Sequence, residues 1–254
     1  MNPPLRLFHY ASPATFYRLA GRLIPAFWLA AALLAAAGLY IGLLRAPADA
    51  TQGEAYRIIF IHVPAAWMSM LLYLVMAFWA AIGWAFNARL ASMVARAIAP
   101  TGAMFTFLAL CTGAVWGRPT WGAWWVWDAR LTSELILLFL YGGYMALVAA
   151  IDDTRRADRA GALLAVIGSV NVPIIYFSVR WWNTLHQGAS VSVTAAPRMA
   201  SIMLTAMLLM TLAFWAYAFA VVFMRTRAIA LERDNHADWA RAVVSPADAI
   251  GKRT

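Results

Sequence analysis

Two of the four histidines in this chain are placed to bind a metal together. His62 lies in the segment "IIFIHVPAAWM" and His186 in "RWWNTLHQGAS", each beside a long apolar run, whereas His9 and His236 lie near the chain ends. A neutral imidazole nitrogen is a good ligand for iron and other transition metals. If the fold brings the two segments together, His62 and His186 can supply two ligands to one metal centre.

A tryptophan-rich segment offers the flat apolar surface that one such centre, a haem, requires. The stretch "WGRPTWGAWWVWDARLTSE" (residues 116–134) contains five of the 13 tryptophans within twelve positions. A haem is a flat apolar ring with two carboxylates at one edge, so aromatic faces and basic side chains suit it. Trp121, Trp124 and Trp125 would share one side of a helix, which predicts an amphipathic helix lying in the membrane interface.

The charged residues near this segment have separate expected roles. Arg130 is the first candidate to pair with a haem carboxylate, with Arg57 and Arg118 behind it, because a guanidinium group can donate two parallel hydrogen bonds to a carboxylate. Asp128 is expected to fix the loop, either by capping backbone amides or by pairing with Arg130. We do not expect Asp128 to bind iron.

Helix starts place several of these residues near the membrane surface. Pro64 is expected in the first turn of a helix, because proline is well tolerated there, so His62 should lie just before that helix. Thr132 or Ser133 is expected to cap a later helix, with Glu134 in its first turn.

The elements that carry these residues are membrane helices. The chain is 64% hydrophobic and 12% charged, with a mean hydropathy of +0.69, and a helix needs about 20 apolar residues to cross a bilayer. Lipid offers no partner to an unpaired backbone group, and the runs lack the alternation of a barrel strand. The sequence therefore predicts an all-α membrane protein with six spans, at about Leu23 to Leu44, Pro64 to Phe86, Val94 to Val115, Leu131 to Ile151, Gly161 to Arg180 and Met199 to Met224.

The distribution of basic residues predicts the orientation of the spans. With both chain ends in the cytoplasm, 14 of the 20 Lys and Arg residues lie on the cytoplasmic side and six on the other, in agreement with the positive-inside rule. The tryptophan-rich loop between spans three and four then faces the periplasm, together with His62 and His186. Residues 1–254 form a single transmembrane domain, in which residues 225–254 are a cytoplasmic tail able to form a short helix.

Other features narrow the function. The basic residues lie at the ends of apolar runs and form no stripe with exposed aromatics, which argues against nucleic-acid binding. The single cysteine, Cys111, excludes a disulfide within the chain and is expected to be a small buried apolar residue.

Two other classes of protein stay open at this point. A membrane b-type cytochrome for electron transfer would normally hold its haem between histidines deep within the spans. A haem-free permease subunit of an ABC transporter would use its tryptophans only as an interfacial belt.

Three motifs resemble one family. "WGRPTWGAWWVWDARLTS" resembles the signature of the haem-handling WWD family of cytochrome c maturation, and "IHVPAAWM" and "WWNTLHQG" resemble its CcmC branch. The resemblance implies a protein of the bacterial inner membrane that receives haem b at a periplasmic site. It implies delivery of that haem to the periplasmic haem chaperone CcmE, with the ABC transporter subunits CcmA and CcmB and the small subunit CcmD releasing the loaded chaperone.

The same resemblance assigns roles to individual residues. It implies that His62 and His186 are the axial ligands of the haem iron. The haem-presenting loop would consist of Trp116, Gly117, Trp121, Trp124, Trp125, Trp127 and Asp128. The expected activity is presentation of ferric haem rather than catalytic turnover, with at most assistance to its covalent attachment.

Overall fold

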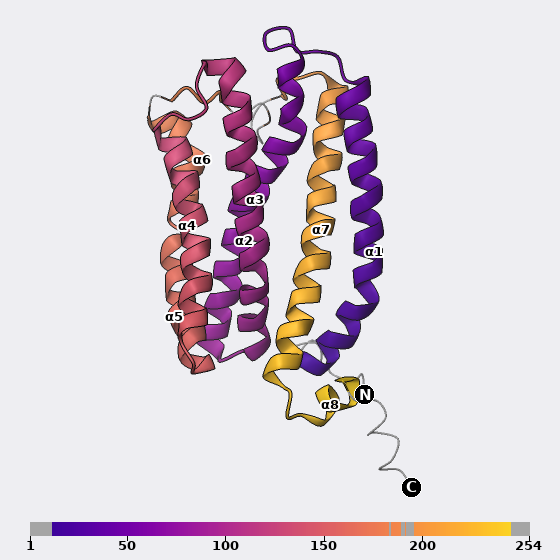
Figure 1. The fold of residues 1–254 in the computed structure, drawn as a ribbon, viewed down its shortest axis with the longest axis vertical. Coiled ribbons are helices and arrows are strands. Elements are labelled where there is room, and N and C mark those ends of the chain that lie inside the picture. Colours follow the sequence, from indigo (N-terminus) through magenta and orange to yellow (C-terminus); the bar gives the residue numbers. More distant parts are fainter. Residues whose placement is uncertain (1–11, 183, 189–190, 192–195, 245–254) are drawn as a thin grey trace, which may run out of the picture.

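The computed structural model describes residues 12–182, 184–188, 191 and 196–244, and these residues are mainly helical (Figure 1). Six helical stretches are long and apolar enough to cross a membrane, which confirms the predicted six-span, all-α fold. The elements are α1 (Pro13–Leu39), η2 (Tyr40–Arg45, a π-helix), η3 (Glu54–Ile58, a 3-10 helix), α2 (Ile59–Phe86), α3 (Arg89–Trp121), α4 (Ala129–Ala150), α5 (Thr154–Gly168), α6 (Asn171–Trp181), α7 (Ser201–Arg233) and α8 (Asp238–Val244).

Several helices extend beyond the apolar runs that predicted them. α1 begins at Pro13, because the Ser12 side chain accepts a hydrogen bond from the Thr15 amide and proline fits the first helical position. α7 continues to Arg233, so the first part of the predicted tail is helical. The tail also contains α8, as expected. His9, which was expected in a cytoplasmic tail, lies outside the described residues.

The fifth span consists of two helices rather than one. α5 ends at Gly168, Ser169 and Val170 form a turn, and α6 begins at Asn171. The buried Asn171 side chain donates a hydrogen bond of 2.9 Å to the Ser133 carbonyl oxygen. This contact ties the start of α6 to α4, close to the proline-containing part of the span.

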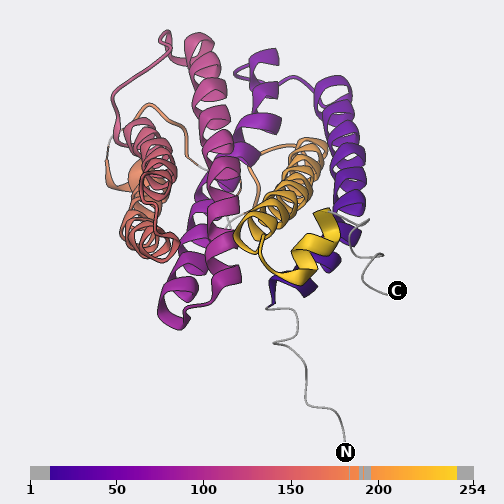
Figure 2. The ribbon, with the colours of Figure 1, turned by 60° about the horizontal axis from the view of Figure 1, so that its bottom comes forward.

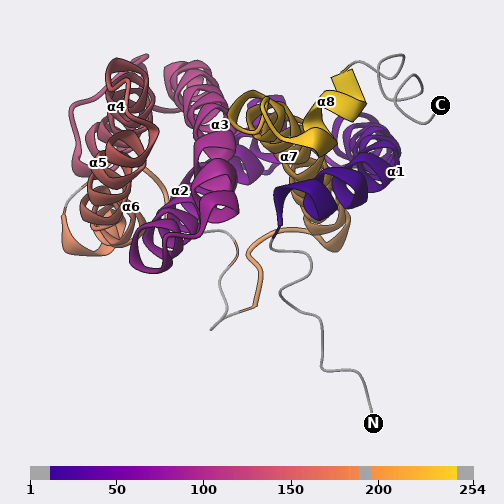
Figure 3. The same cartoon turned by 90° about the horizontal axis from the view of Figure 1, so that it is seen from below.

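The helices form two groups that meet along α2, α3 and α7. α1 packs on α7 along most of its length, while α4, α5 and α6 pack together and against α2 and α3 (Figures 1 and 3). At one end, Arg233 of α7 donates two hydrogen bonds of 2.7 and 2.8 Å to Asp158 of α5. We refer to α2–α6 as the bundle and to α1 with α7 as the helix pair.

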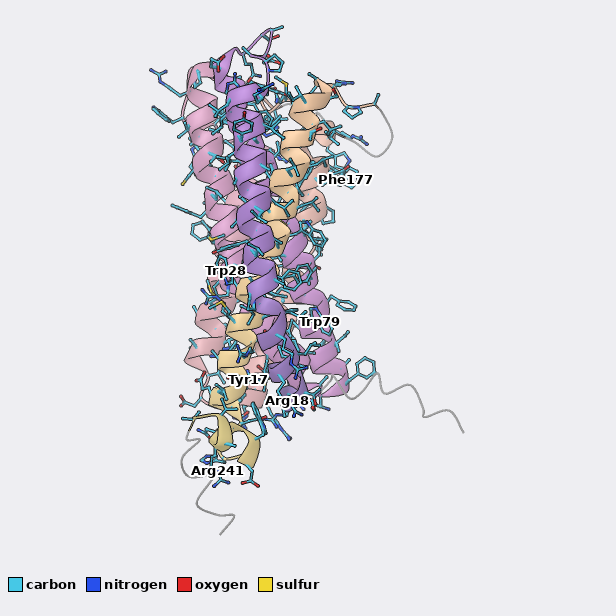
Figure 4. The ribbon with its side chains drawn as sticks, turned by 90° about the vertical axis from the view of Figure 1, so that its right-hand side faces the viewer. Tyr17, Arg18, Trp28, Trp79, Phe177 and Arg241 are labelled. Carbon is cyan, nitrogen blue, oxygen red and sulfur yellow. The ribbon has the colours of Figure 1, made fainter. Side chains whose placement is uncertain are left out.

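The two ends of the molecule differ. α8 lies beside the start of α1, and Tyr17, Arg18 and Arg241 are found together at this end (Figures 2 and 4). The opposite end carries η3 and the connection between α3 and α4 (Figure 1). We call them the α8 end and the loop end.

The expectation that Cys111 is buried is wrong. Cys111 is exposed on α3 rather than buried. Because it lies within an apolar span, its side chain is suited to contact lipid, and a thiol is apolar enough to do so.

Candidate functional site

The two histidines singled out in the sequence lie side by side at the loop end. His62 belongs to α2, and His186 lies in the connection between α6 and α7. Their ring centres are 6.4 Å apart and their planes differ by 35°. Two imidazoles that bind one metal ion from opposite sides, with metal–nitrogen bonds of about 2 Å, have ring centres about 6 Å apart. The observed spacing therefore suits a single shared ion.

Hydrogen bonds fix which nitrogen of each ring is free. The Thr112 hydroxyl donates to the Leu108 carbonyl at 2.6 Å, so its oxygen accepts from Nδ1 of His62 at 3.0 Å. Nδ1 of His186 lies 2.8 Å from the Gln187 carbonyl oxygen, which can only accept. Nδ1 is the protonated nitrogen in both rings, and each Nε2 keeps a lone pair for a metal.

The charge state of His186 also favours metal binding. Burial, together with the nearby positive charge of Arg130, lowers the pKa of His186 to about 4. The imidazole is therefore neutral at physiological pH, as a ligand must be.

Tryptophans surround the histidine pair. The Trp116 ring packs edge-on against His62 at 5.5 Å, and the Trp121 ring lies 6.1 Å from His186. Trp125 packs against Trp127 at 5.4 Å. Trp124 and Trp127 are 58% and 75% exposed, so part of the aromatic surface is open at the loop end.

The predicted amphipathic helix through these tryptophans is wrong. α3 runs on to Trp121, so Trp116 and Gly117 are helical. Gly117 faces the Trp121 ring. The helix ends at Gly122, whose φ of 79° is readily adopted only by glycine and whose amide donates to the Arg118 carbonyl at 3.1 Å. From Ala123 to Asp128 the chain is not helical, so Trp121, Trp124 and Trp125 share no helix face.

The start of α2 also differs from the prediction. η3 leads directly into α2, which begins at Ile59, so His62 lies within the helix rather than before it. Pro64 is inside the helix and not in its first turn. The sequence placed the start too late because Pro64 was taken as a first-turn residue, whereas residues 59–63 already belong to the helix.

Asp128 begins α4 and also contacts the His186 segment. One carboxylate oxygen accepts from the Leu131 amide at 2.8 Å, and the other accepts from the Thr184 hydroxyl. The Thr184 oxygen in turn accepts from the His186 amide at 3.0 Å. Asp128 therefore caps α4, which was one of its two expected roles. It also positions His186 through Thr184.

The predicted caps and the expected role of Glu134 are both wrong. Ser133 donates its hydroxyl back to the Ala129 carbonyl at 2.5 Å, and Thr132 follows Asp128 inside α4. Glu134 is only 7% exposed and lies 2.6 Å from the Ser69 hydroxyl of α2. That hydroxyl also lies 2.8 Å from the Ala66 carbonyl. The Ser69 hydroxyl donates to the Glu134 carboxyl oxygen, so this pair links α2 to α4.

Two glutamines that the sequence analysis did not single out join three segments around the site. The Trp116 indole nitrogen donates to the Gln52 side chain at 2.7 Å, and the Gln52 amide donates to Gln187 at 2.9 Å. Gln187 directly follows His186, and this position next to a candidate ligand is the only feature of the sequence that could have pointed to it. Gln52, Thr112 and Thr184 carry no pattern that distinguishes them from ordinary loop or helix residues.

Two cavities meet at the histidine pair, and both are lined by His62, His186 and Arg130. The first, which we call the apolar cavity, has a volume of about 50 Å³ and is also lined by Trp121, Trp125 and Glu134. The second, which we call the basic cavity, has a volume of about 350 Å³ and is also lined by Arg180 and Arg198.

The arginines proposed from the sequence differ in position. Arg130 donates to the Ile175 carbonyl at 2.9 Å and lines both cavities. Arg57 pairs with Glu54 and donates to the Gly42 carbonyl at 2.7 Å, and Arg118 donates to the Gly122 carbonyl at 2.5 Å. Neither Arg57 nor Arg118 lines either cavity.

The fold and the site together define a class: a six-span helical membrane protein with a tryptophan-flanked histidine pair at one end. Comparison with known proteins makes this specific. The chain belongs to the CcmC family, heme exporter protein C, whose sequence pattern matches residues 6–241.

Relatives named heme exporter protein C match most of the chain. The protein of Haemophilus influenzae is 44% identical over 237 residues, which are 93% of this chain and 96% of that protein. The protein of Escherichia coli K12 is 52% identical over 184 residues, 72% and 75% of the two chains. The protein of Bradyrhizobium diazoefficiens is 47% identical over 232 residues, 91% and 85% of the two chains.

Proposed function

We propose that this protein takes part in haem export for cytochrome c maturation, by holding haem b at the loop end and presenting it to a haem chaperone. The observation that carries the proposal is the pair of imidazoles, His62 and His186, 6.4 Å apart with both Nε2 atoms free. Membership of the heme exporter protein C family supports haem as the cargo.

The surroundings of the pair suit a flat, largely apolar molecule. Trp116 and Trp121 contact the two histidines, and Trp125 lines the adjoining apolar cavity. Binding sites for ligands of this size usually have volumes of about 300–1,000 Å³, whereas the apolar cavity has about 50 Å³. We therefore expect the non-helical segment from Ala123 to Asp128 to shift outward when haem binds.

We propose that the loop end faces the periplasm in the bacterial inner membrane. The α8 end holds most of the described basic residues, among them Arg155, Arg156 and Arg159 at the start of α5, and the cytoplasmic side is generally the more basic one. The exposed rings of Trp124 and Trp127 would then form the surface that the chaperone CcmE approaches. CcmA, CcmB and CcmD are the partners expected to release the loaded chaperone.

In this proposal the protein positions its cargo and carries out no catalytic turnover. His62 and His186 hold the iron, Asp128 and Thr184 hold the His186 segment, and the tryptophans shield the ring from water. Two neutral imidazoles in a partly hydrated site favour the ferric ion, because water and polar groups stabilise its additional charge.

An absorbance spectrum of the purified, haem-supplemented full-length protein tests the proposal. We expect a Soret band of six-coordinate haem that weakens or shifts in His62→Ala and in His186→Ala. His236→Ala is the matched control, because His236 lies at the α8 end, and its spectrum should equal that of the wild type.

Three results would reject the proposal or change it. A colourless wild type would favour a haem-free permease subunit. Unchanged spectra in both site variants would place the haem elsewhere. Reversible reduction of the bound haem by quinol would favour an electron-transfer cytochrome instead. Loss of haem transfer to CcmE in the two site variants would establish the delivery step.

A further inference from the structure

The basic cavity has a composition that the iron ligands alone do not explain. It is lined by Arg130 from α4, Arg180 from α6 and Arg198 just before α7, together with both histidines, and no acidic side chain lines it. Within the described part of the chain, none of the three arginines forms an ion pair. Three guanidinium groups from separate elements therefore face one space without a carboxylate.

The two cavities differ in chemistry on the two sides of the histidine pair. Trp121 and Trp125 line only the apolar cavity, whereas Arg180 and Arg198 line only the basic cavity; Arg130 and Gln187 line both. A flat ring whose iron lies between the two imidazoles extends beyond the pair in its own plane. Its opposite edges would therefore enter the two cavities.

We propose that Arg180 and Arg198, together with Arg130, bind the two propionates of the porphyrin and so fix the orientation of the ring. This inference rests on the proposed function and adds to it the orientation of the haem ring in the site. The propionate edge lies in the basic cavity, because guanidinium groups bind carboxylates with charge-assisted hydrogen bonds. The opposite edge, which carries the vinyl groups, lies on the side of Trp121 and Trp125.

This orientation explains why arginines distant from the tryptophan motif belong to the site. An unoriented ring could present either its carboxylate edge or its vinyl edge to a partner. With its propionates held in the basic cavity, the ring turns its vinyl edge toward the apolar cavity, which Trp121 and Trp125 line.

The test compares haem with haem dimethyl ester, in which both carboxylates are masked and the ring and iron are kept. Both porphyrins are titrated into the purified full-length wild type, the double variant Arg180→Gln, Arg198→Gln, and the control Arg45→Gln. Arg45 ends η2 at the loop end and lines neither cavity. The Soret band reports binding and its position reports bis-histidine ligation.

We expect the wild type and the control to bind haem at least about tenfold more tightly than the diester, as loss of a charge-assisted hydrogen bond implies. The double variant should bind the diester as the wild type does, which also shows that it is folded. Its preference for haem should fall to less than about threefold.

Other outcomes overturn the inference. An unchanged preference in the double variant would mean that these arginines do not contact the propionates. Equal binding of both porphyrins by the wild type, with a bis-histidine spectrum, would leave the proposed function intact and reject the orientation; the arginines would then be free to hold a lipid phosphate. No Soret band with either porphyrin would reject both. If the double variant binds neither porphyrin, an unchanged preference in both single variants, Arg180→Gln and Arg198→Gln, overturns the inference.

Discussion

The bundle and the helix pair differ in how much of their surface is buried and in the contacts that hold their helices together. In the most apolar stretch of α2, 61% of the residues are buried, compared with 17% in α1. α1 holds α7 through aromatic contacts such as Phe27 on Phe219 at 5.1 Å and Trp28 on Tyr217 at 5.5 Å. The bundle instead buries polar side chains that link different helices, as Glu134 and Ser69 do.

The difference indicates where function resides. A buried polar group in a membrane protein is costly unless it is paired, so such groups are retained mainly where they position something. In the helix pair, the buried Thr226 hydroxyl only returns to the Val222 carbonyl of its own helix at 2.7 Å. The helix pair is therefore chiefly a scaffold, and the bundle forms the site together with the connection between α6 and α7 that carries His186 and Arg198.

Replacement of Glu134 should give the largest difference between a change in the bundle and a change in the helix pair. Glu134→Ala removes the contact with Ser69 and leaves a gap beside the apolar cavity. It should lower the free energy of unfolding by about 2 kcal/mol and reduce haem retention. Glu134→Gln keeps an acceptor for the Ser69 hydroxyl and should be close to wild type. Thermal unfolding in detergent measures the first effect, and the Soret absorbance the second.

Thr226→Val is the matched change in the helix pair. Its effect should stay below about 0.5 kcal/mol, because the lost hydrogen bond lies within one helix. Equal losses in Glu134→Ala and Thr226→Val would remove the proposed distinction between site and scaffold.

A smaller effect separates the two ends of the bundle. Asp128 and Asp153 both cap helices, at 2.8 Å from the amides of Leu131 and Arg156. Replacement of either by alanine should cost about 1 kcal/mol. Only Asp128→Ala should also weaken haem retention, because Asp128 accepts from Thr184 beside His186 and Asp153 lies far from the site. Parallel losses of haem in both variants would refute the positioning role of Asp128.

The smallest expected effect is that of pH. Because the pKa of His186 is lowered to about 4, its neutral form persists well below the ordinary histidine range. Protons should compete with iron for this ring only as the pH falls toward 4, so haem retention should be flat between pH 8 and 6. A titration followed at the Soret band checks this. A loss centred near pH 6.5 would show an ordinary, solvated histidine.

The sequence was sufficient for the six spans and for the candidate histidines. Apolar runs are long enough to identify a span whatever the neighbouring helices are, and histidines beside tryptophans stand out by residue type. The number of spans was correct although their ends were not, because helix ends depend on caps such as Asp128 and turns such as Gly122.

The supporting contacts could not be predicted in the same way. Gln52, Thr112 and Thr184 act through residues distant in the sequence, and no local spacing predicts such pairs. Glu134 resembled an ordinary helix-start residue because its partner, Ser69, lies on another helix. The predicted amphipathic helix failed for a local reason, since Gly122 ends α3 immediately after Trp121.

The central claim is that His62 and His186 are the two ligands of one haem iron. It is tested most directly by adding imidazole to the haem-supplemented glycine variants His62→Gly and His186→Gly. The account predicts that each variant loses the six-coordinate spectrum and that free imidazole, filling the space of the missing ring, restores it. A six-coordinate spectrum in either variant without imidazole would contradict the claim, because the iron would then have a different ligand.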